Sequence, residues 1–422
     1  MTDYIGKRLL ILGGAPQACK VVTTAKAMGI YTIVADINEN ATAKKLADEA
    51  LNIGLYDYDA LISWCKANPV DGIINICIDF AQKPLQYLCT KLGYPSFGTD
   101  EQVRQLTDKN AFKKLCASTG IDIIPEYTDS QCMRGEVVLP LFIKPAESSG
   151  SRGASICAEA SEIAPAIEKA KELSRNGDVI IERYYGDKPD FMVTYIFIDG
   201  KPYLQRTADR YHGDRKDGME NVGALAISPS KYTDLFFRQG IYDRLTRMLT
   251  GMGLKNCAVF FQGFVDGDRI RFYDPGIRLP GGNYENILKA ATGIDVVKMF
   301  IEYSLTGKMG SCDLEKLRYA YKLNGKYAAI VFPMVSPGTI SRVEGLSQIE
   351  TMPSVVSSTY RYHEGDTVQK TSDVTQRFGE YNLLADSKEA LINAITEIQK
   401  ALVVLNEKGE DMVISRPLLT DL

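Results

Sequence analysis

Short apolar runs alternate with helical stretches at the start of the chain. Residues 8–12 form an apolar run that ends in Gly13-Gly14, a helical pattern extends to residue 28, and residues 31–35 form a second run that ends at Asp36. A third apolar run covers residues 72–78. Strands joined by helices pair in parallel, so these runs predict a small parallel sheet with helices on its faces.

The position of Asp36 leaves a dinucleotide-binding alternative open. A carboxylate after the second strand is where a dinucleotide-binding fold holds a ribose. The glycine pattern is G-G-A-P-Q-A, however, and not G-x-G-x-x-G. An NAD-dependent oxidoreductase therefore has only Asp36 in its favour.

The middle of the chain carries helix signals followed by strand signals. Thr99 and Gln102 are spaced as a capping box, and a further helix is predicted from near Asp108 to Gly120. The segments then predicted are a strand at 137–144, a loop at 147–153, a helix at 161–174, a strand at 179–182 and a hairpin turning at 199–200.

The pattern of the remaining residues predicts two further units. A long helix at 233–252 leads into a second hairpin, 258–265 with 269–274, turning through the three residues 266–268. A new mixed α/β unit begins near Tyr319 and closes with a helix at 387–405.

Composition narrows the class of protein. A chain of 422 residues is long enough for about three domains, and 45% apolar with 24% charged residues is typical of a globular protein. The net charge is −4 without a dense Lys or Arg run, which argues against a nucleic-acid or membrane-surface partner. Residues 1–7 lack the apolar segment of a signal peptide, so we expect a cytoplasmic protein.

Cysteine and histidine usage excludes other site types. The nine cysteines include no C-x-x-C pair and read as reduced core residues. Only His212 and His363 are present, so a His-rich zinc site is excluded.

A lysine at a strand end predicts a phosphate site. Lys144 ends an apolar run and is followed by the small-residue loop Ser148-Ser149-Gly150-Ser151-Arg152-Gly153. A point charge beside exposed backbone N–H groups suits a polyphosphate. The alternative is a strand lysine that extends to solvent before an ordinary surface loop.

The order of these segments from Leu106 to Arg278 resembles the ATP-grasp superfamily. The tail resembles the carboxyl-terminal region of its biotin carboxylase and purine-biosynthetic members. The resemblance implies an α/β and α+β chain of three domains: an N-terminal parallel α/β domain at 1–100, a two-lobed ATP-grasp domain at 101–305 with a mobile lobe at about 121–187, and a biotin carboxylase-like mixed α/β domain at 306–422.

The resemblance also implies the ligand set. ATP would be held by Lys109, Lys144, Ser148, Ser149, Gly150, Ser151, Gly153, Glu182, Arg183, Tyr184, Tyr185 and Asp190, with the lysines on phosphates, the backbone of 183–185 on the adenine and Asp190 on the ribose. Magnesium, with manganese as a substitute, would be held by Gln262 and Asp274. From the predicted three-residue turn, these two would lie diagonally on one face of the hairpin, roughly 7 Å apart.

The metal motif departs from the family pattern. Gln262 replaces a carboxylate, Gly276 an asparagine and Ile277 a proline. The Gln has a parallel in carbamoyl phosphate synthetases, but the thinner ligand set favours one magnesium over two.

The function implied is an ATP-dependent ligase that phosphorylates a small carboxylate for capture by an amine. Arg278 would stabilise the transferred charge, and an anionic substrate would meet Arg206, Arg210, His212, Gly281 and Gly282. The alternative for Arg206, Arg210 and His212 is a charge-rich connector on the solvated surface. A bicarbonate-using carboxylase is the nearest variant, and a non-catalytic nucleotide-binding regulator is the alternative of another class. A homodimer is typical of tails of this kind.

Overall fold

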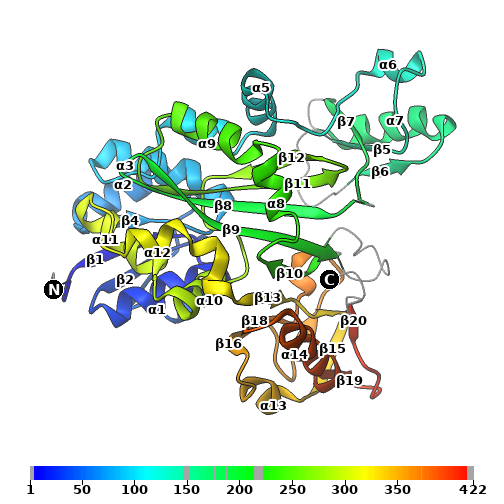
Figure 1. The fold of residues 1–422 in the computed structure, drawn as a ribbon. Coiled ribbons are helices and arrows are strands. Elements are labelled where there is room, and N and C mark those ends of the chain that lie inside the picture. The colour runs from blue at the N-terminus through cyan, green and yellow to red at the C-terminus, as the bar shows by residue number, and fades with distance from the viewer. Residues whose placement is uncertain are drawn as a thin grey trace.

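The protein is described by a computed structural model over residues 4–145, 153–174, 177–186, 188–212, 222–371 and 373–415 (Figure 1). An N-terminal α/β part lies beside the broad central sheet, a small lobe extends from one end of that sheet, and the C-terminal part lies below it in the view. This is the three-part architecture expected from the motif order.

The N-terminal part confirms the predicted parallel sheet. Its strand order is β3-β2-β1-β4, with β1 (Arg8–Leu12) paired in parallel to β2 (Tyr31–Ala35) and β4 (Gly72–Ile74), and β2 paired in parallel to β3 (Glu49–Leu51). Helices α1 (Cys19–Ala27), α2 (Tyr58–Ala67) and α3 (Gln82–Leu92) connect or flank these strands.

The third strand is shorter than its apolar run. It stops at Ile74 because the Asn75 side chain turns the backbone, accepting hydrogen bonds from the N–H groups of Cys77 and Ile78 and donating one to the Ile78 carbonyl.

An eight-stranded antiparallel sheet forms the centre of the molecule. Its order is β12-β11-β8-β9-β10-β13-β18-β16. The strands are β8 (Asp190–Ile198), β9 (Lys201–His212), β10 (Gly223–Ser228), β11 (Cys257–Asp266), β12 (Arg269–Gly276), β13 (Tyr327–Val331), β16 (Val355–Tyr360) and β18 (Gly379–Ala385). Because β10 pairs with β13, one sheet continues from the predicted ATP-grasp segment into the C-terminal segment.

The other elements form the small lobe, the C-terminal part and the remaining helices. The lobe has the sheet β6 (Ser155–Cys157), β5 (Leu141–Pro145), β7 (Val179–Arg183), with α6 (Asp129–Met133) and α7 (Ile163–Leu173). The C-terminal part has β14 (Met334–Val335), β15 (Gly338–Glu344), β17 (Thr367–Val368), β19 (Val403–Asn406), β20 (Val413–Ser415), α13 (Leu346–Glu350) and α14 (Lys388–Ala401). The remaining helices are α4 (Asp100–Gln105), α5 (Lys109–Thr119), α8 (Thr233–Arg238), α9 (Ile241–Gly251), α10 (Tyr284–Thr292), α11 (Val296–Thr306) and α12 (Leu314–Arg318).

Helix ends with local signals were predicted correctly. Thr99 and Gln102 form the capping box of α4, and the Asp108 carboxylate accepts the Ala111 N–H at the start of α5. Gly120 ends α5 in the left-handed conformation, at φ +70°.

Two long helices were predicted wrongly. The segment 233–252 is two helices, α8 and α9, separated at Gly240, whose φ of +62° cannot continue a helix. The closing helix ends at Ala401, and the apolar residues after it form β19, which pairs with β15. An apolar run alone does not separate a buried strand from a helix.

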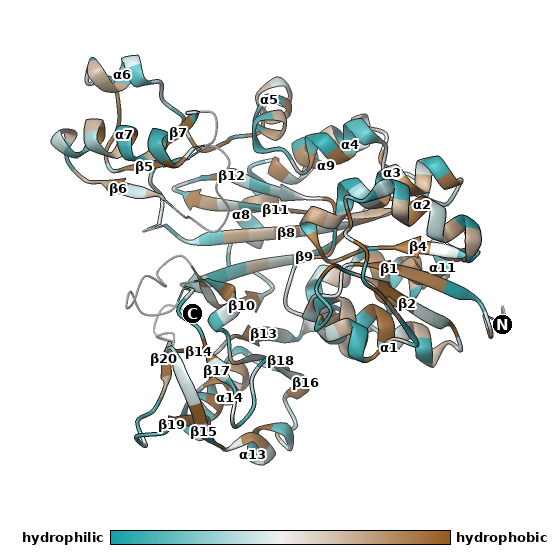
Figure 2. Cartoon of the chain, turned by 180° about the vertical axis from the view of Figure 1, so that it is seen from behind, coloured by the Kyte–Doolittle hydropathy of each residue, from teal (hydrophilic) through white to brown (hydrophobic). Residues whose placement is uncertain are grey.

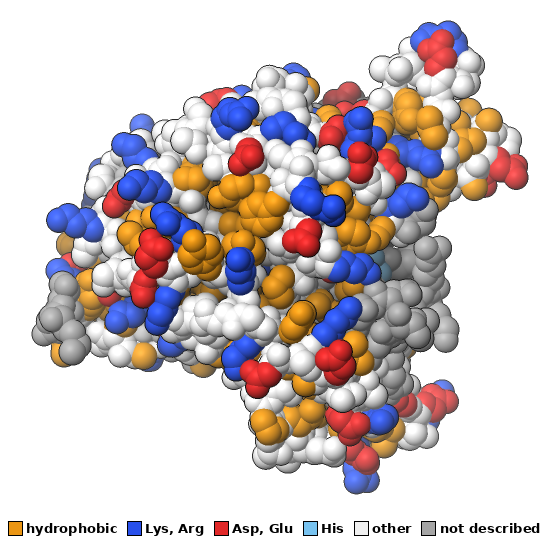
Figure 3. Space-filling view, viewed as in Figure 1, with side chains coloured by type: hydrophobic (Ala, Val, Ile, Leu, Met, Phe, Trp, Pro, Cys, Tyr) orange, Lys and Arg blue, Asp and Glu red, His pale blue; other side chains and the backbone are white. Residues whose placement is uncertain are grey.

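The main core joins the N-terminal part to the central sheet. Phe97 packs edge-on against Phe300 at 5.5 Å, and Phe112 of α5 stacks on Phe261 of β11 at the same ring separation. Figure 2 shows the strands of the N-terminal sheet as predominantly hydrophobic, and Figure 3 shows Lys, Arg, Asp and Glu interspersed over one face of the molecule. No helix in the part of the chain that the structure describes is long and apolar enough to cross a membrane.

Candidate functional site

A cavity of about 250 Å³ lies between the small lobe and the end of the central sheet. It brings together many residues that were predicted to bind nucleotide, metal or substrate. They are Lys109, Lys144, Glu182, Arg183, Tyr184, Tyr185, Asp190, Arg210, His212 and Gln262. Six elements supply them, namely α5, the lobe strands β5 and β7, and the sheet strands β8, β9 and β11, with the hinge after β7.

Glu182 lies between two lysines. Its side chain is 8% exposed, and its carboxylate accepts from Lys113 Nζ at 2.6 Å and from Lys144 Nζ at 2.9 Å. Burial would raise the Glu182 pKa, but the two ammonium groups outweigh it and lower the pKa. For Lys144, burial dominates over Glu182 and, with Lys109 nearby, lowers the pKa. The strand-end lysine is therefore held in place within the pocket by Glu182.

Lys113 is a residue of this site that the sequence motifs did not single out. It also forms an ion pair with Glu126, whose backbone makes an isolated antiparallel β-bridge with that of Glu182. Burial opposes its charge, yet the two carboxylates raise its pKa. Its spacing of four residues after Lys109 on α5, one helical turn, is the signal that could have identified it.

The predicted adenine-reading backbone is partly engaged within the protein. The Arg183 N–H donates to the Pro125 carbonyl at 2.9 Å, and the Tyr184 N–H donates to the Pro140 carbonyl at 2.8 Å. These two N–H groups hold the lobe together and are not available to a base. An adenine at this hinge, as predicted, would need other groups as its partners.

Asp190 is the centre of a buried polar cluster. One carboxylate oxygen is 3.0 Å from Arg210 Nη1, 3.2 Å from the Tyr273 hydroxyl and 3.9 Å from His212 Nε2. The other oxygen has no hydrogen-bond partner among the described residues. Burial raises the Asp190 pKa to about 6, against the opposing effect of Arg210. An unpaired acceptor oxygen suits a ligand that donates hydroxyl groups.

The two predicted metal ligands are cross-strand partners. Gln262 of β11 is directly opposite Asp274 of β12, because the turn has two residues, Gly267 and Asp268, and the register shifts by one at Gln262. The predicted three-residue turn and diagonal arrangement are therefore wrong, although both side chains share one face. Tyr273, the extra residue of the bulge, hydrogen-bonds the Gln262 amide oxygen at 3.2 Å.

These donors fit a single magnesium ion. One carboxylate and one amide oxygen, completed by phosphate oxygens and water, make the oxygen-only shell that magnesium prefers. Asp274 also lies 3.4 Å from Lys109 Nζ, which balances its charge. Among the described residues, no group of three or more His, Cys, Asp or Glu is arranged to hold a metal by itself.

Arg278 is engaged away from the cavity. Its guanidinium makes a two-point ion pair with Asp79 of the N-terminal part and lies over the Phe260 ring at 4.7 Å. Phe260 also contacts the place where a Cβ on Gly276 would lie, at 2.1 Å, so a side chain at 276 is excluded by packing. The asparagine that the ATP-grasp pattern has at this position would therefore clash with Phe260.

Arg206 lies on the same side of the sheet but deeper. It is 1% exposed, with its Nε hydrogen-bonded to Ser228 at 2.9 Å and its guanidinium over Tyr284 at 4.1 Å. Neither terminal nitrogen has a hydrogen-bond partner among the described residues. Gly282 has φ +92°, and a Cβ there would come within 2.7 Å of the Phe332 ring, whereas a Cβ at Gly281 would meet open space.

Some predicted residues have other placements. Ser148, Ser149, Gly150 and Ser151 lie outside the described residues. Gly153 is described, at φ +76°, and a Cβ there would approach Leu173 to 2.9 Å, so its role in the structure is close packing. Asp36 accepts the N–H groups of Gly14 and Asn38, which gives this carboxylate a structural partner set in place of a ribose.

Comparisons with known proteins agree with this architecture. Residues 331–407 match the family L-amino acid ligase C-terminal domain 2. An L-amino acid ligase from Bacillus licheniformis superposes with a TM-score of 0.76 at 15% identity, covering 96% of this chain and 99% of that chain. The biotin carboxylase domain of 2-oxoglutarate carboxylase from Hydrogenobacter thermophilus, solved with MgADP and bicarbonate, superposes with a TM-score of 0.73 at 18% identity, covering 95% and 91%.

A relative of known activity also aligns by sequence. The mitochondrial methylcrotonoyl-CoA carboxylase subunit alpha of Arabidopsis thaliana is 25% identical over 221 residues. That alignment covers 46% of this chain and 29% of the carboxylase subunit, so the chain spans less than a third of that relative.

The chain therefore has the fold of the L-amino acid ligase and of the biotin carboxylase domain, and its residues 331–407 match the L-amino acid ligase C-terminal domain 2.

Proposed function

We propose that this protein is an ATP-dependent ligase that transfers the γ-phosphate of ATP to a small carboxylate and lets an amine displace phosphate from the acyl phosphate. The observation that carries the proposal is the convergence of Lys109, Lys144 and Gln262 on one cavity, with Asp274 opposite Gln262 and 3.4 Å from Lys109 Nζ. Such an arrangement supplies cations for phosphate oxygens and oxygen ligands for a metal, which phosphoryl transfer requires.

Each group has a role that follows from its placement. Lys144, steadied by Glu182, contacts phosphate oxygens from a fixed strand end, and Lys109 lies beside Asp274. Asp190 takes the ribose hydroxyls on its unpaired oxygen. Asp274 and Gln262 would hold magnesium, which would neutralise the charge that develops on the phosphates.

Arg206 is the residue that would bind the carboxylate substrate. A buried guanidinium with two unpaired terminal nitrogens is costly unless an anion meets it. A carboxylate substrate supplies that anion. Arg278, which is paired with Asp79 away from the cavity, would have to exchange that partner for the substrate in order to stabilise transferred charge.

The test is a screen for ADP release with pairs of carboxylates and amines, L-amino acids first. We expect ADP above the ATP-only rate for at least one pair, with a product whose mass is the sum of the two substrates less one water. Asp274→Asn is the control for contaminating activity. ATP binding by calorimetry with no ADP release from any pair would favour a non-catalytic regulator.

Bicarbonate is included as a separate arm because the 2-oxoglutarate carboxylase domain has the same fold. ADP release that depends on bicarbonate, with incorporation of labelled carbon into the second substrate, would favour a carboxylase over an amine ligase. Binding of NAD as tight as that of MgATP would contradict both.

A further inference from the structure

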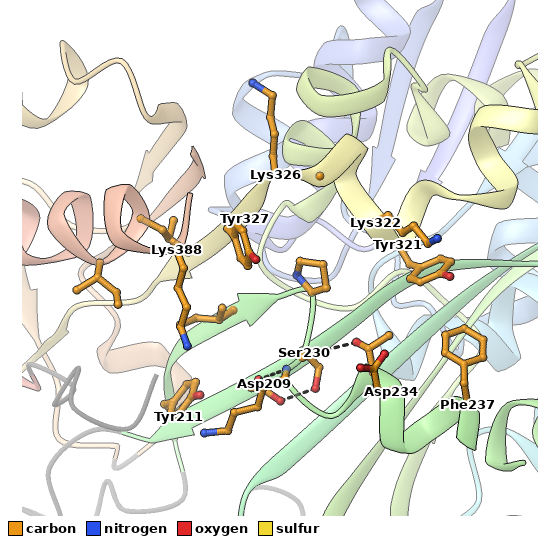
Figure 4. A pocket seen from close by; sticks show the side chains of 17 residues that line it. Asp209, Tyr211, Ser230, Asp234, Phe237, Tyr321, Lys322, Lys326, Tyr327 and Lys388 are labelled. Carbon is orange, nitrogen blue, oxygen red and sulfur yellow. Dashed lines mark hydrogen bonds between the residues drawn. The ribbon is translucent and has the colours of Figure 1, made fainter. Parts of the chain in front are cut away.

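A second cavity, of about 570 Å³, lies on the reverse face of β9 and β10 (Figure 4). It is bounded by α8, by the short helix η5 (Ala320–Gly325), by the start of β13 and by the first turn of α14. Successive side chains of a strand point to opposite faces, so Asp209 and Tyr211 line this cavity while Arg210 between them lines the nucleotide pocket. The sheet therefore separates the two sites.

Aromatic rings form much of the wall. Tyr211, Phe237, Tyr321 and Tyr327 come from four different elements. Phe237 and Tyr321 are 5.6 Å apart with an interplanar angle of 47°, and Tyr327 is 36% exposed. The cavity thus offers ring faces to a ligand and is reachable from solvent.

The charged lining is mainly cationic. Lys231, Lys322, Lys326 and Lys388 line the cavity against two carboxylates, Asp209 and Asp234. Asp209 is already engaged, since it accepts from the Ser230 hydroxyl at 2.5 Å and from the Lys231 N–H at 2.8 Å. Lys326 pairs with Asp386 at 2.7 Å.

Lys388 is the cation best placed to meet a ligand. It is the first residue of α14, which Ser387 caps, and Figure 4 shows its amine extending from the helix toward Asp209 and Tyr211. It is half-buried and makes no ion pair with any residue in the described ranges. Lys322, across the cavity, is held over the rings of Tyr319 and Tyr321 at 5.4 and 5.8 Å.

We propose that this cavity is a second small-molecule site, for an anion that carries an aromatic ring. The acid group is met by Lys388 and its neighbouring amines, and the ring packs among Tyr211, Phe237 and Tyr321. A cationic ligand would be repelled by the excess of lysines. A wholly apolar ligand would desolvate the lysine ammonium groups without replacing their hydrogen bonds to water. The volume is within the range of about 300–1,000 Å³ usual for such sites.

Pyridoxal 5′-phosphate is a suitable probe because it is a planar aromatic anion whose aldehyde condenses with a lysine amine, losing water, and borohydride then reduces the imine. After reduction and peptide mapping, we expect label on cavity lysines at probe concentrations at least tenfold below those that label the exposed Lys83. MgATP should leave this labelling unchanged. Labelling that follows exposure alone, or that MgATP abolishes, would overturn the proposal.

Competitors and variants complete the test. Phenyl phosphate and 4-hydroxybenzoate distinguish a phosphate ligand from a carboxylate ligand, and protection by neither would overturn the proposal. Lys388→Gln and Tyr321→Leu should each weaken the protecting ligand at least fivefold, measured on folded protein with an unchanged thermal melt. Lys400→Gln, on the same helix but paired with Glu397 and outside the cavity, should not change it. Equal affinity in all three variants would contradict the assignment.

Discussion

Two arginines of β9, four residues apart, lie on the same side of the central sheet in opposite electrostatic settings. Arg210 is 3.0 Å from the Asp190 carboxylate and 3.2 Å from the Tyr273 hydroxyl. Arg206 has Ser228 on its Nε and Tyr284 beneath it, and no partner on either terminal nitrogen among the described residues. Burial opposes the charge of both: Asp190 nevertheless raises the Arg210 pKa, whereas burial lowers the pKa of Arg206 to about 10.

Under the proposed function, the two arginines serve two different substrates. The end of the sheet with Arg210 carries its own counter-charges, so its pocket would be held in shape before ATP arrives. The deeper end retains a positive charge that only a further anion can satisfy. A preformed nucleotide site beside a site completed by its anionic substrate is what a carboxylate ligase needs.

Removal of each arginine should change the stability of the protein differently. Arg210→Met leaves Asp190 buried and unpaired, so unfolding free energy should fall by about 3 to 5 kcal/mol, the usual cost of breaking a buried pair. Arg206→Met removes a buried charge that forms no ion pair with a described residue and whose burial outweighs the favourable effect of Tyr284 and Glu285, so stability without substrate should stay level or rise. Urea unfolding at pH 7.5 measures both; equal losses would show that Arg206 is also paired.

At the nucleotide end, Asp274→Asn should lower turnover on the order of 10²–10³-fold while leaving ATP affinity within about threefold. The carboxylate acts on charge that develops during phosphoryl transfer and contributes little to the bound ground state. Steady-state kinetics and calorimetry separate the two quantities. Unchanged turnover would place the metal ligand elsewhere.

Two lysines on one carboxylate give a matched pair of variants. Lys144→Met should weaken MgATP binding by about 1.5 to 3 kcal/mol, roughly 10- to 150-fold, because a charge-assisted hydrogen bond to phosphate is lost, while the fold survives. Lys113→Met leaves Glu126 and Glu182 without their shared cation and should lower stability first. If Lys144→Met bound MgATP as tightly as the parent, Lys144 would be structural.

The smallest effect concerns pH. Burial raises the Asp190 pKa from 3.8 to about 6, so this carboxyl is protonated at pH 5, where an ordinary aspartate is ionised. An ionised carboxylate accepts ribose hydroxyls better than a protonated one, so MgATP affinity should fall about three- to tenfold as pH drops from 7.5 to 5. Asp190→Asn is the control for ionisation of ATP itself and should lack the Asp190 component. An identical pH profile in parent and variant would exclude this role.

Local signals in the sequence predicted what depends on neighbouring residues. The Thr99 capping box, the Asp108 cap and the Gly120 helix end need only residues three or four apart. Motif order predicted the gathering of Lys144, Glu182 and Asp190 around one cavity. Lys144 and Glu182 share one face of the antiparallel strands β5 and β7, and Asp190 begins the next strand of the chain, β8.

The features of the site that the sequence did not predict depend on tertiary contacts. The bulge that sets Gln262 opposite Asp274 occurs where a Cβ on Gly263 would come within 2.9 Å of the Arg271 carbonyl, a contact made across the hairpin. The use of the Arg183 and Tyr184 N–H groups depends on Pro125 and Pro140, which the lobe brings to them. Neither contact can be predicted from the hydrophobic periodicity of the sequence.

The most direct test of the proposed chemistry follows an oxygen atom. Phosphorylation of a carboxylate makes one carboxylate oxygen the bridge of the acyl phosphate, and attack by the amine breaks the carbon–oxygen bond, so that oxygen leaves with phosphate. With the carboxylate substrate identified by the ADP screen and labelled with ¹⁸O, we expect the phosphate released to carry one ¹⁸O. Phosphate free of label, in the presence of ligated product, would contradict an acyl phosphate route.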